Sequence, residues 1–178
     1  MLAGELYDPL DHQLTTARFA ARELCRRFNA SGEDETALRS SLLEQLFDCA
    51  TDAWIQPPFY CDYGTNVHLG RKVFFNFNCV VLDVASVKIG SHVLFGPAVQ
   101  IYTASHPMQA AQRRTGQECA LPIVVGDDVW VGGGTIICPG VRIGDRSIIG
   151  AGSVVTRDIP SDTVAAGNPC KVIRAAPG

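Results

Sequence analysis

A β-branched aliphatic residue stands at every sixth position between residues 125 and 155 of this chain. The six residues are Val125, Val131, Ile137, Ile143, Ile149 and Val155, and a glycine directly follows four of them. A fixed six-residue period is a sequence signature of a β-helix, in which each repeat supplies one short strand and one corner. Valine and isoleucine suit an inward-facing strand position, and glycine suits a corner where a Cβ would be crowded. The period predicts a mainly β chain, a parallel β-helix in which three repeats form each triangular coil.

Two other architectures conflict with this repeat. Glycine costs about 1 kcal/mol in a helix interior, so glycines at this density argue against an α-helix. A βαβ arrangement is also excluded, because its parallel strands need a crossover of about a dozen residues or more. Stacked coils of short strands are the interpretation that remains.

The N-terminal region follows a different period. Apolar residues at steps of three and four predict two amphipathic helices. They are Leu14, Ala17, Ala21, Leu24 and Phe28 in the first, and Leu38, Leu42, Leu46 and Ala50 in the second. Asp11 is a suitable N-cap for the first helix. We therefore predict two domains, an N-terminal helical hairpin that caps the structure at 1–55 and a β-helix at 56–174.

The six-residue rhythm is weaker before residue 125. Leu69, Phe75 and Val81 are six residues apart, and Ile89, Phe95 and Ile101 resume the rhythm after a slip of two residues. The rhythm then breaks in the middle of the β-helix. Ile101 and Val125 are 24 residues apart, which equals four repeats, yet residues 102–121 lack the aliphatic–glycine pattern. Loops longer than about 12–15 residues in a compact domain are usually functional or disordered. We predict that 102–121 is a loop extruded from the wall of the β-helix, and that it carries function.

The composition argues against several function classes. A formal net charge of −3 is unlike the basic footprint of a nucleic-acid-binding protein. The sequence contains no apolar run of about 18 residues that could span a membrane, and Met1–Leu10 does not resemble a signal peptide. Seven cysteines without a C-x-x-C pair predict small buried thiols in a reducing compartment. We expect a cytoplasmic protein with neither a membrane nor a nucleic acid as partner.

The interrupted segment contains the best candidates for acid–base chemistry. His106 lies near its start, before the rigid Pro107, and an unperturbed histidine pKa of about 6.5 suits a general base at neutral pH. Glu118 could orient His106 if the loop folds back on itself. The alternatives are a solvent-facing histidine and a solvated glutamate. No two histidines stand at close metal-ligand spacing, so no metal site is expected.

Residues outside the loop each have two interpretations. Trp130 occupies an outward position of the repeat, which indicates a covering subunit or ligand. Asn76 belongs either to a structural ladder of asparagines or to a cleft, and Asp62 either holds ligand hydroxyl groups or lies at a solvated corner. A late group of basic residues could hold a polyphosphate or be ordinary surface charge. Its members are Arg157, Lys171 and Arg174.

Seen together, these motifs resemble those of one family over nearly the whole chain. They are AGELY at 3–7, PPFYCDYG at 57–64, FFNFNCVVLDV at 74–84, IYTASHP at 101–107, VGDDVWVGGGTIICPGVRIGD at 125–145 and VVTRDIPSDTVAAGNPCKVIR at 154–174. The chain is similar to the bacterial sugar O-acetyltransferases of the hexapeptide-repeat acyltransferase superfamily. The maltose type is nearest, with galactoside and nodulation acetyltransferases as relatives. The resemblance implies that the β-helix is left-handed and is an acyltransferase domain. It also implies a homotrimer with active sites between subunits, and acetyl-CoA as co-substrate with no required metal.

The same resemblance implies roles for individual residues. His106 matches the catalytic general base, and Glu118 matches its carboxylate partner. The positions implied for acceptor binding are Asp8, Asp62, Asn76 and Trp130. The positions implied for coenzyme A are Gly133, Ala151, Thr156, Arg157, Lys171 and Arg174. Together they imply direct acetyl transfer from acetyl-CoA to a hydroxyl of a maltose-like or glucose-like sugar.

Three alternatives stay open at this point. The acceptor could be a chito-oligosaccharide or another hydroxylated small molecule. The protein could also be a non-catalytic β-helix scaffold that binds sugar without turning it over. The γ-class carbonic anhydrases share this type of fold, but they hold zinc with three histidines from two subunits, and the close H-x₄-H pair is missing here.

Overall fold

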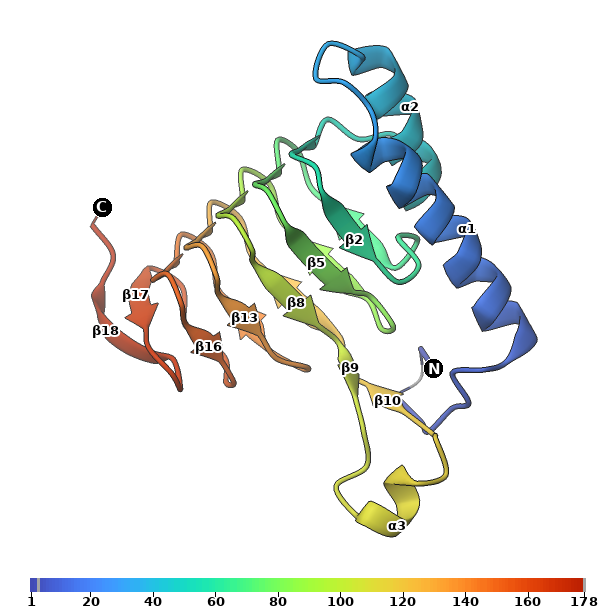
Figure 1. The fold of residues 1–178 in the computed structure, drawn as a ribbon. Helices are drawn as coiled ribbons and strands as arrows, with labels where there is room; N and C mark the ends of the chain where they lie inside the picture. Colours follow the sequence, from blue (N-terminus) through green and yellow to red (C-terminus); the bar gives the residue numbers. More distant parts are fainter. Residues whose placement is uncertain (3, 178) are drawn as a thin grey trace.

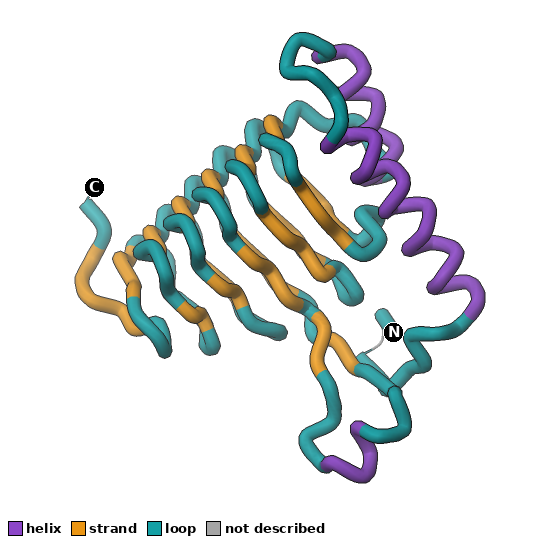
Figure 2. Tube along the Cα trace, viewed as in Figure 1, coloured by secondary structure: helices purple, strands orange, loops and turns teal. Residues whose placement is uncertain are grey.

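The chain forms a left-handed parallel β-helix of about six turns with two helices packed at its N-terminal end. The computed structural model describes residues 1–2 and 4–177, and Figures 1 and 2 show the stacked coils with the helices beside the first of them. The predicted mainly β fold class is thereby confirmed. Ala3, the first residue of the AGELY motif, lies outside the described residues.

Helices α1 (His12–Asn29) and α2 (Thr36–Phe47) form the predicted hairpin. Asp11 caps α1, because its side chain accepts hydrogen bonds from the backbone N–H groups of Gln13 and Leu14. Helix α2 ends at Phe47, one residue before Asp48 adopts a left-handed backbone conformation. Its predicted apolar face is therefore shorter than expected, since Ala50 lies beyond the helix. The boundary between a cap at 1–55 and a β-helix at 56–174 stays a proposal.

Three parallel sheets form the walls of a triangular prism. The first wall contains β1 (Trp54–Ile55), β4 (Phe74–Phe75), β7 (Leu94–Phe95), β12 (Trp130–Val131), β15 (Ile148–Ile149) and β17 (Thr163–Ala166). The second wall contains β2 (Phe59–Cys61), β5 (Cys79–Leu82), β8 (Gln100–Tyr102), β13 (Ile136–Ile137) and β16 (Val154–Val155). The third wall contains β3 (Val67–Leu69), β6 (Val87–Ile89), β11 (Ile123–Val125) and β14 (Arg142–Ile143). Strand β18 (Lys171–Ala175) pairs antiparallel with β17 and ends the first wall.

The six-residue period marks the interior of the prism. All six repeat residues between Val125 and Val155 are buried, as predicted from their spacing. Three phenylalanines from successive coils stack in the same interior: Phe75 lies 5.5 Å from Phe59 and 4.4 Å from Phe95 between ring centroids. Buried residues of α1 and α2 join the same apolar cluster, so the helices cover the open end of the first coil. The seven cysteines are all free, and Cys49, in the turn after α2, is exposed where a buried thiol was predicted.

Glycine stands at the corners because the next coil leaves no room for a Cβ. A Cβ on Gly132 would lie 2.5 Å from the backbone nitrogen of Ala151, and one on Gly144 would lie 2.4 Å from that of Ser161. The residue with a left-handed backbone conformation comes two positions after each of these corner glycines. It is often not a glycine; Asp128 and Arg146 are examples. Crowding rather than positive φ therefore explains the glycine that follows the repeat residue.

Two of the prism's edges matter for the site. We call the edge between the first and second walls the glycine edge; it contains residues 76–78, 96–98, 132–134 and 150–152. We call the edge between the second and third walls the loop edge. It contains residues 62–66, 83–86 and 103–122 in the first three coils. The inward residues on either side of this edge are eight positions apart in the second coil (Val81 and Ile89) but six apart in the fourth (Ile137 and Ile143). This explains why the six-residue rhythm slips before Ile89 and breaks after Ile101.

The segment that leaves the loop edge is an extruded hairpin, as predicted, with secondary structure of its own. Strands β9 (Ala104–Ser105) and β10 (Cys119–Ala120) pair antiparallel, and the short helix α3 (Ala110–Arg113) lies at the tip. In Figure 1 this hairpin projects away from the walls, with the N-terminal segment of the chain beside its base.

Candidate active site

His106 and Glu118 lie one residue beyond the paired strands of the hairpin, β9 and β10. Ser105 pairs with Cys119, so one further step of the same antiparallel register brings His106 level with Glu118. His106 is exposed and Glu118 is half-buried. No hydrogen bond joins their side chains within the described part of the chain. The backbone register supports the predicted pairing of His106 with Glu118, and the pairing stays a prediction.

Glu118 is held by a residue that the sequence analysis did not single out. The Tyr7 hydroxyl donates a hydrogen bond of 2.7 Å to Glu118 Oε2. The two residues also exchange both backbone hydrogen bonds, each of 3.0 Å. Burial and the neighbouring Glu118 carboxylate raise the pKa of Tyr7 well above its ordinary value, so its hydroxyl remains a donor.

The loop edge gathers the carboxyl groups. Asp62, in the first coil, is half-buried, and its pKa is raised by burial and by the nearby Asp83. Asp83, in the second coil, is fully buried, and Oδ1 accepts hydrogen bonds from the backbone N–H groups of Asp62 (3.0 Å) and Tyr63 (2.9 Å). Asp83 thus fixes the turn that carries Asp62, a role the sequence analysis missed. Asp8 follows Tyr7 and is exposed, with Oδ1 accepting from the backbone N–H of Leu10.

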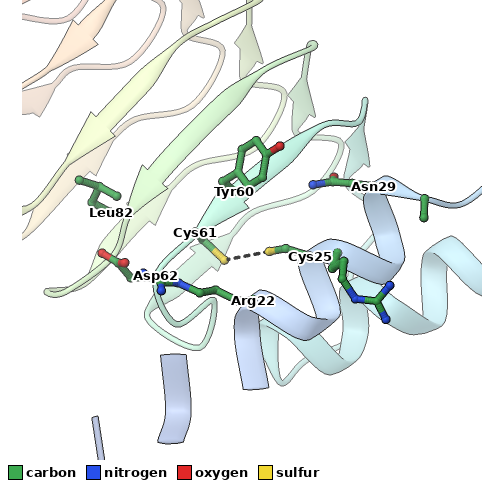
Figure 3. A pocket seen from close by; sticks show the side chains of 9 residues that line it. Arg22, Cys25, Asn29, Tyr60, Cys61, Asp62 and Leu82 are labelled. Atoms are coloured by element: carbon green, nitrogen blue, oxygen red, sulfur yellow. Dashed lines mark hydrogen bonds between the residues drawn. The ribbon is translucent and has the colours of Figure 1, made fainter. Parts of the chain in front are cut away.

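A cavity of about 600 Å³ lies between α1 and the outer face of the second wall. Figure 3 shows Asp62 and Arg22 at one end of it, the Tyr60 ring beside it, and the thiols of Cys25 and Cys61 in contact at 3.7 Å. Among the described residues, the side chains of Arg22, Tyr60 and Asp62 make no hydrogen bond. The cavity therefore offers an aromatic face, a cation and a carboxylate to a polar ligand.

The glycine edge contains a second group of predicted site residues. Asn76 is half-buried there, and its Oδ1 accepts a hydrogen bond from the backbone N–H of Phe77. Gly133 and Ala151 lie in the same stack of corners, two and three coils further along. The N–H of Gly132 donates to Ile149, and that of Gly134 donates to Pro97. Gly133 is the member of this glycine run whose N–H has no acceptor in the described chain, which makes it the candidate donor to a ligand.

The remaining predicted residues lie on outer surfaces. Trp130 is on the outer face of the first wall with 54% of its surface exposed, as predicted for an outward position. Thr156 and Arg157 are exposed at the loop edge of the fifth coil, directly after β16. Lys171 and Arg174 are exposed on β18.

Seven of the predicted residues form two separate groups within one chain. His106 and Glu118 lie on the hairpin, Asp62 lies at the loop edge from which the hairpin leaves, and Asp8 lies in the N-terminal segment next to Tyr7, which bonds to Glu118. Asn76, Gly133 and Ala151 belong to the glycine edge, at the opposite side of the second wall. One copy of the chain does not bring the two groups together.

Over positions 1–2 and 4–177, no group of three or more histidine, cysteine, aspartate or glutamate side chains could hold a metal ion. Neither α1 nor any other described helix is long and apolar enough to cross a bilayer.

Triangular coils, a glycine-rich edge and a histidine on an extruded hairpin define a hexapeptide-repeat transferase. Family models agree with this class in two parts of the chain. The model described as maltose acetyltransferase hexapeptide capping motif matches residues 1–49, and the bacterial transferase hexapeptide model, with six repeats, matches residues 122–157. The chain belongs to the maltose and galactoside O-acetyltransferase family of hexapeptide-repeat acetyltransferases, and it is an acyltransferase.

Individual relatives are similar over almost the whole chain. The galactoside O-acetyltransferase of Escherichia coli (strain K12) is 42% identical, over 97% of this chain and 85% of that protein. The crystal structure of a maltose O-acetyltransferase from Clostridium difficile 630 superposes with a TM-score of 0.97 at 46% identity, covering 99% of this chain and 95% of that one. A hexapeptide-repeat acetyltransferase from Vibrio cholerae, solved in complex with acetyl coenzyme A, gives a TM-score of 0.92 at 39% identity, covering 100% and 97%.

Proposed function

We propose that this protein transfers an acetyl group from acetyl-CoA to a hydroxyl of a maltose-like or glucose-like sugar, with His106 as general base. The observation that carries the proposal is the antiparallel pairing of Ser105 with Cys119, because the next residues along the two strands of this hairpin are His106 and Glu118. The relative solved with acetyl coenzyme A supports the choice of acetyl donor. The relatives named for maltose and galactoside support a sugar acceptor.

The proposed reaction is a direct transfer. The acceptor oxygen attacks the carbonyl carbon of the thioester while His106 takes the hydroxyl proton. The tetrahedral intermediate then collapses, the carbon–sulfur bond breaks, and the proton passes from the imidazolium to the departing thiolate. The products are an O-acetylated sugar and free CoA thiol. A sugar hydroxyl is too weak an acid to ionise at neutral pH, so the base acts during the attack.

The remaining roles follow the chemistry that each position offers. The N–H of Gly133 is the proposed donor to the oxyanion, since its neighbours' N–H groups are already bonded within the ladder. Glu118 orients His106 and stabilises the imidazolium. Asp8, Asp62 and Asn76 hold the acceptor, and the cavity beside Asp62 leaves room for a longer saccharide. Trp130 packs against the bound substrates.

The coenzyme is assigned to surface positions of the later coils. Ala151 and Thr156 are small or polar positions that let the pantetheine chain approach the wall. Basic side chains are suited to the coenzyme's phosphates through charge-assisted hydrogen bonds. They are Arg157, Lys171 and Arg174.

We also propose that the protein is a homotrimer whose active sites form between subunits. The two groups of site residues lie at different edges of one chain, so a neighbouring copy is needed to join them. The outer face of the first wall supports this, because its cross-strand neighbours Trp54, Phe74, Leu94 and Trp130 form an apolar row. Rows of this kind usually mark a protein interface.

Release of free CoA thiol tests the proposed activity. We expect thiol release only when acetyl-CoA and an acceptor sugar are both present, across a panel of glucose, maltose, a β-galactoside and chito-oligosaccharides. Mass spectrometry of the acceptor then identifies the acetylated product. Sugar binding without thiol release from any panel member would indicate a non-catalytic scaffold. Turnover restricted to chito-oligosaccharides would replace the proposed acceptor class while keeping the reaction.

Subunit mixing tests the shared site. We expect His106→Ala and Asn76→Ala each to keep less than about a tenth of wild-type turnover, because each disables every site in its own homotrimer. When the two variants are mixed in equal amounts, about a quarter of the sites in the hybrid trimers should be intact. Such a site takes His106 from one variant and Asn76 from the other, and each choice has a chance of about one half. Light scattering should give three times the chain mass of 19.1 kDa. A mixture no more active than its components would place both residues of a site in one chain.

A further inference from the structure

The N-terminal segment contacts the hairpin at the position of the proposed catalytic pair. Tyr7 and Glu118 form an isolated antiparallel bridge, with both backbone hydrogen bonds at 3.0 Å. The Tyr7 side chain is buried with Tyr63, Val84 and Ala120 in a small apolar cluster separate from the main core. Its hydroxyl reaches out of this cluster to Glu118 Oε2 at 2.7 Å. Residue 7 thus extends the two-stranded hairpin by a third backbone segment.

The bonding pattern of this ribbon fixes the directions of the side chains. Both backbone groups of Glu118 bond to Tyr7, so toward β9 it occupies a non-hydrogen-bonded position opposite His106. Directly opposed residues of an antiparallel pair point to the same face, and side chains in non-hydrogen-bonded pairs are the closer ones. Extended by one residue, the Ser105–Cys119 register puts the His106 side chain on the same face of the ribbon as those of Glu118 and Tyr7.

We infer that Tyr7 is a positioning residue for the catalytic pair: its hydroxyl fixes the Glu118 carboxylate so that the carboxylate can orient His106. The inference rests on the proposed function, because it gives Tyr7 a role through Glu118 and His106. One oxygen of Glu118 is occupied by Tyr7, which leaves the other available to the imidazole. The N-terminal segment, rather than the hairpin alone, then determines the geometry of the base.

The surroundings of Tyr7 support a donor that stays protonated. Burial, the hydrogen bond to Glu118 and its charge raise the pKa of Tyr7, with smaller contributions from Tyr63 and Asp62. The Arg18 guanidinium donates to the Tyr63 hydroxyl at 2.9 Å, so its charge is directed at Tyr63. The Tyr7 hydroxyl therefore stays protonated at neutral pH and donates to Glu118.

Tyr7→Phe is the direct test, because it removes the hydroxyl and keeps the buried ring. We expect kcat to fall about tenfold with little change in the KM for acetyl-CoA, since hydrogen bonds to charged groups are among the stronger ones. In a Glu118→Gln background, the same change should lower kcat by less than about twofold, because the carboxylate it positions is gone. The acidic limb of the kcat–pH profile should move to lower pH, since a less well-placed carboxylate stabilises the imidazolium less.

Tyr63→Phe is the matched control. Tyr63 is buried in the same cluster, and its hydroxyl bonds to Arg18 instead of Glu118. We expect its effect on kcat to stay within about twofold, to be additive with Glu118→Gln and to leave the pH profile in place. Melting temperatures of all variants report whether any loss of activity reflects unfolding.

The outcomes separate this inference from the proposed function. An additive Tyr7→Phe effect, with an unmoved pH profile in a protein that still needs His106, would overturn the positioning role alone. Full activity of His106→Ala would overturn the general base and the positioning role together. Non-additivity confined to Tyr7 and Glu118, absent for Tyr63, supports the inference.

Discussion

His106→Ala should lower kcat by about 10²–10⁴-fold, the range that general acid–base catalysis usually contributes. The side chain is exposed and makes no hydrogen bond within the described chain, so its removal should leave the melting temperature nearly unchanged. Acetyl-CoA should bind with a nearly unchanged Kd, because the proposed coenzyme positions lie elsewhere on the coil. Thiol release measures turnover, and calorimetric titration measures the affinity.

His68→Ala is a suitable control for this experiment. His68 is also exposed, but it points outward from β3 on the third wall, among charged side chains such as Lys88. We expect it to keep wild-type turnover. A His106→Ala protein with near-normal kcat would contradict the assignment of the general base, whereas loss of acetyl-CoA binding would turn His106 into a binding residue.

Phe75→Ala should destabilise the protein by about 3–5 kcal/mol, the usual cost of deleting a buried phenylalanine ring. Phe75 is fully buried, and its ring lies between those of Phe59 and Phe95 in the coils above and below. Removal of the ring leaves a cavity in the middle of this aromatic stack. The backbone hydrogen bonds of β4 to β1 and β7 keep the coils in place, so the cavity cannot collapse. Urea unfolding followed by circular dichroism measures the change.

Phe19→Ala provides the comparison for that loss. Phe19 lies on α1 with 69% of its surface exposed, so the same deletion there should change stability by less than about 0.5 kcal/mol. Similar losses for both variants would mean that the aromatic stack contributes no more than a surface residue. Light scattering of both variants checks that neither substitution changes the oligomeric state of the protein.

The core and the position of the hairpin could be predicted from the sequence because both depend on local spacing. A residue such as Ile137 is inward for the same reason as Ile143 six residues later, and each is identified by its period alone. The extruded segment is visible for the converse reason: its sequence lacks the period. The outward direction of Trp130 is predicted by the same period, because Trp130 directly precedes the inward Val131 and neighbouring residues of a strand face opposite sides.

The contacts around the candidate site could not be predicted in this way. The hydrogen bond between Tyr7 and Glu118 joins residues 111 positions apart, and no period relates them. Asp83 stands at a corner, where a carboxylate is usually solvated, and its burial arises only because the long corners of the first three coils stack on one another. The AGELY motif was the available signal for Tyr7, but it indicated the family rather than a contact.

The antiparallel β18 has a consequence for how copies of this chain can associate. A parallel β-helix ends in unpaired backbone groups on which a further strand could add. Here β18 covers the last strand of the first wall, Val154 of the second wall bonds to Gly167 and Cys170, and Ile159 pairs with Ile143 of the third. The helices close the opposite end. The coil therefore does not continue as a parallel stack beyond either end, which favours association of copies through the sides of the prism.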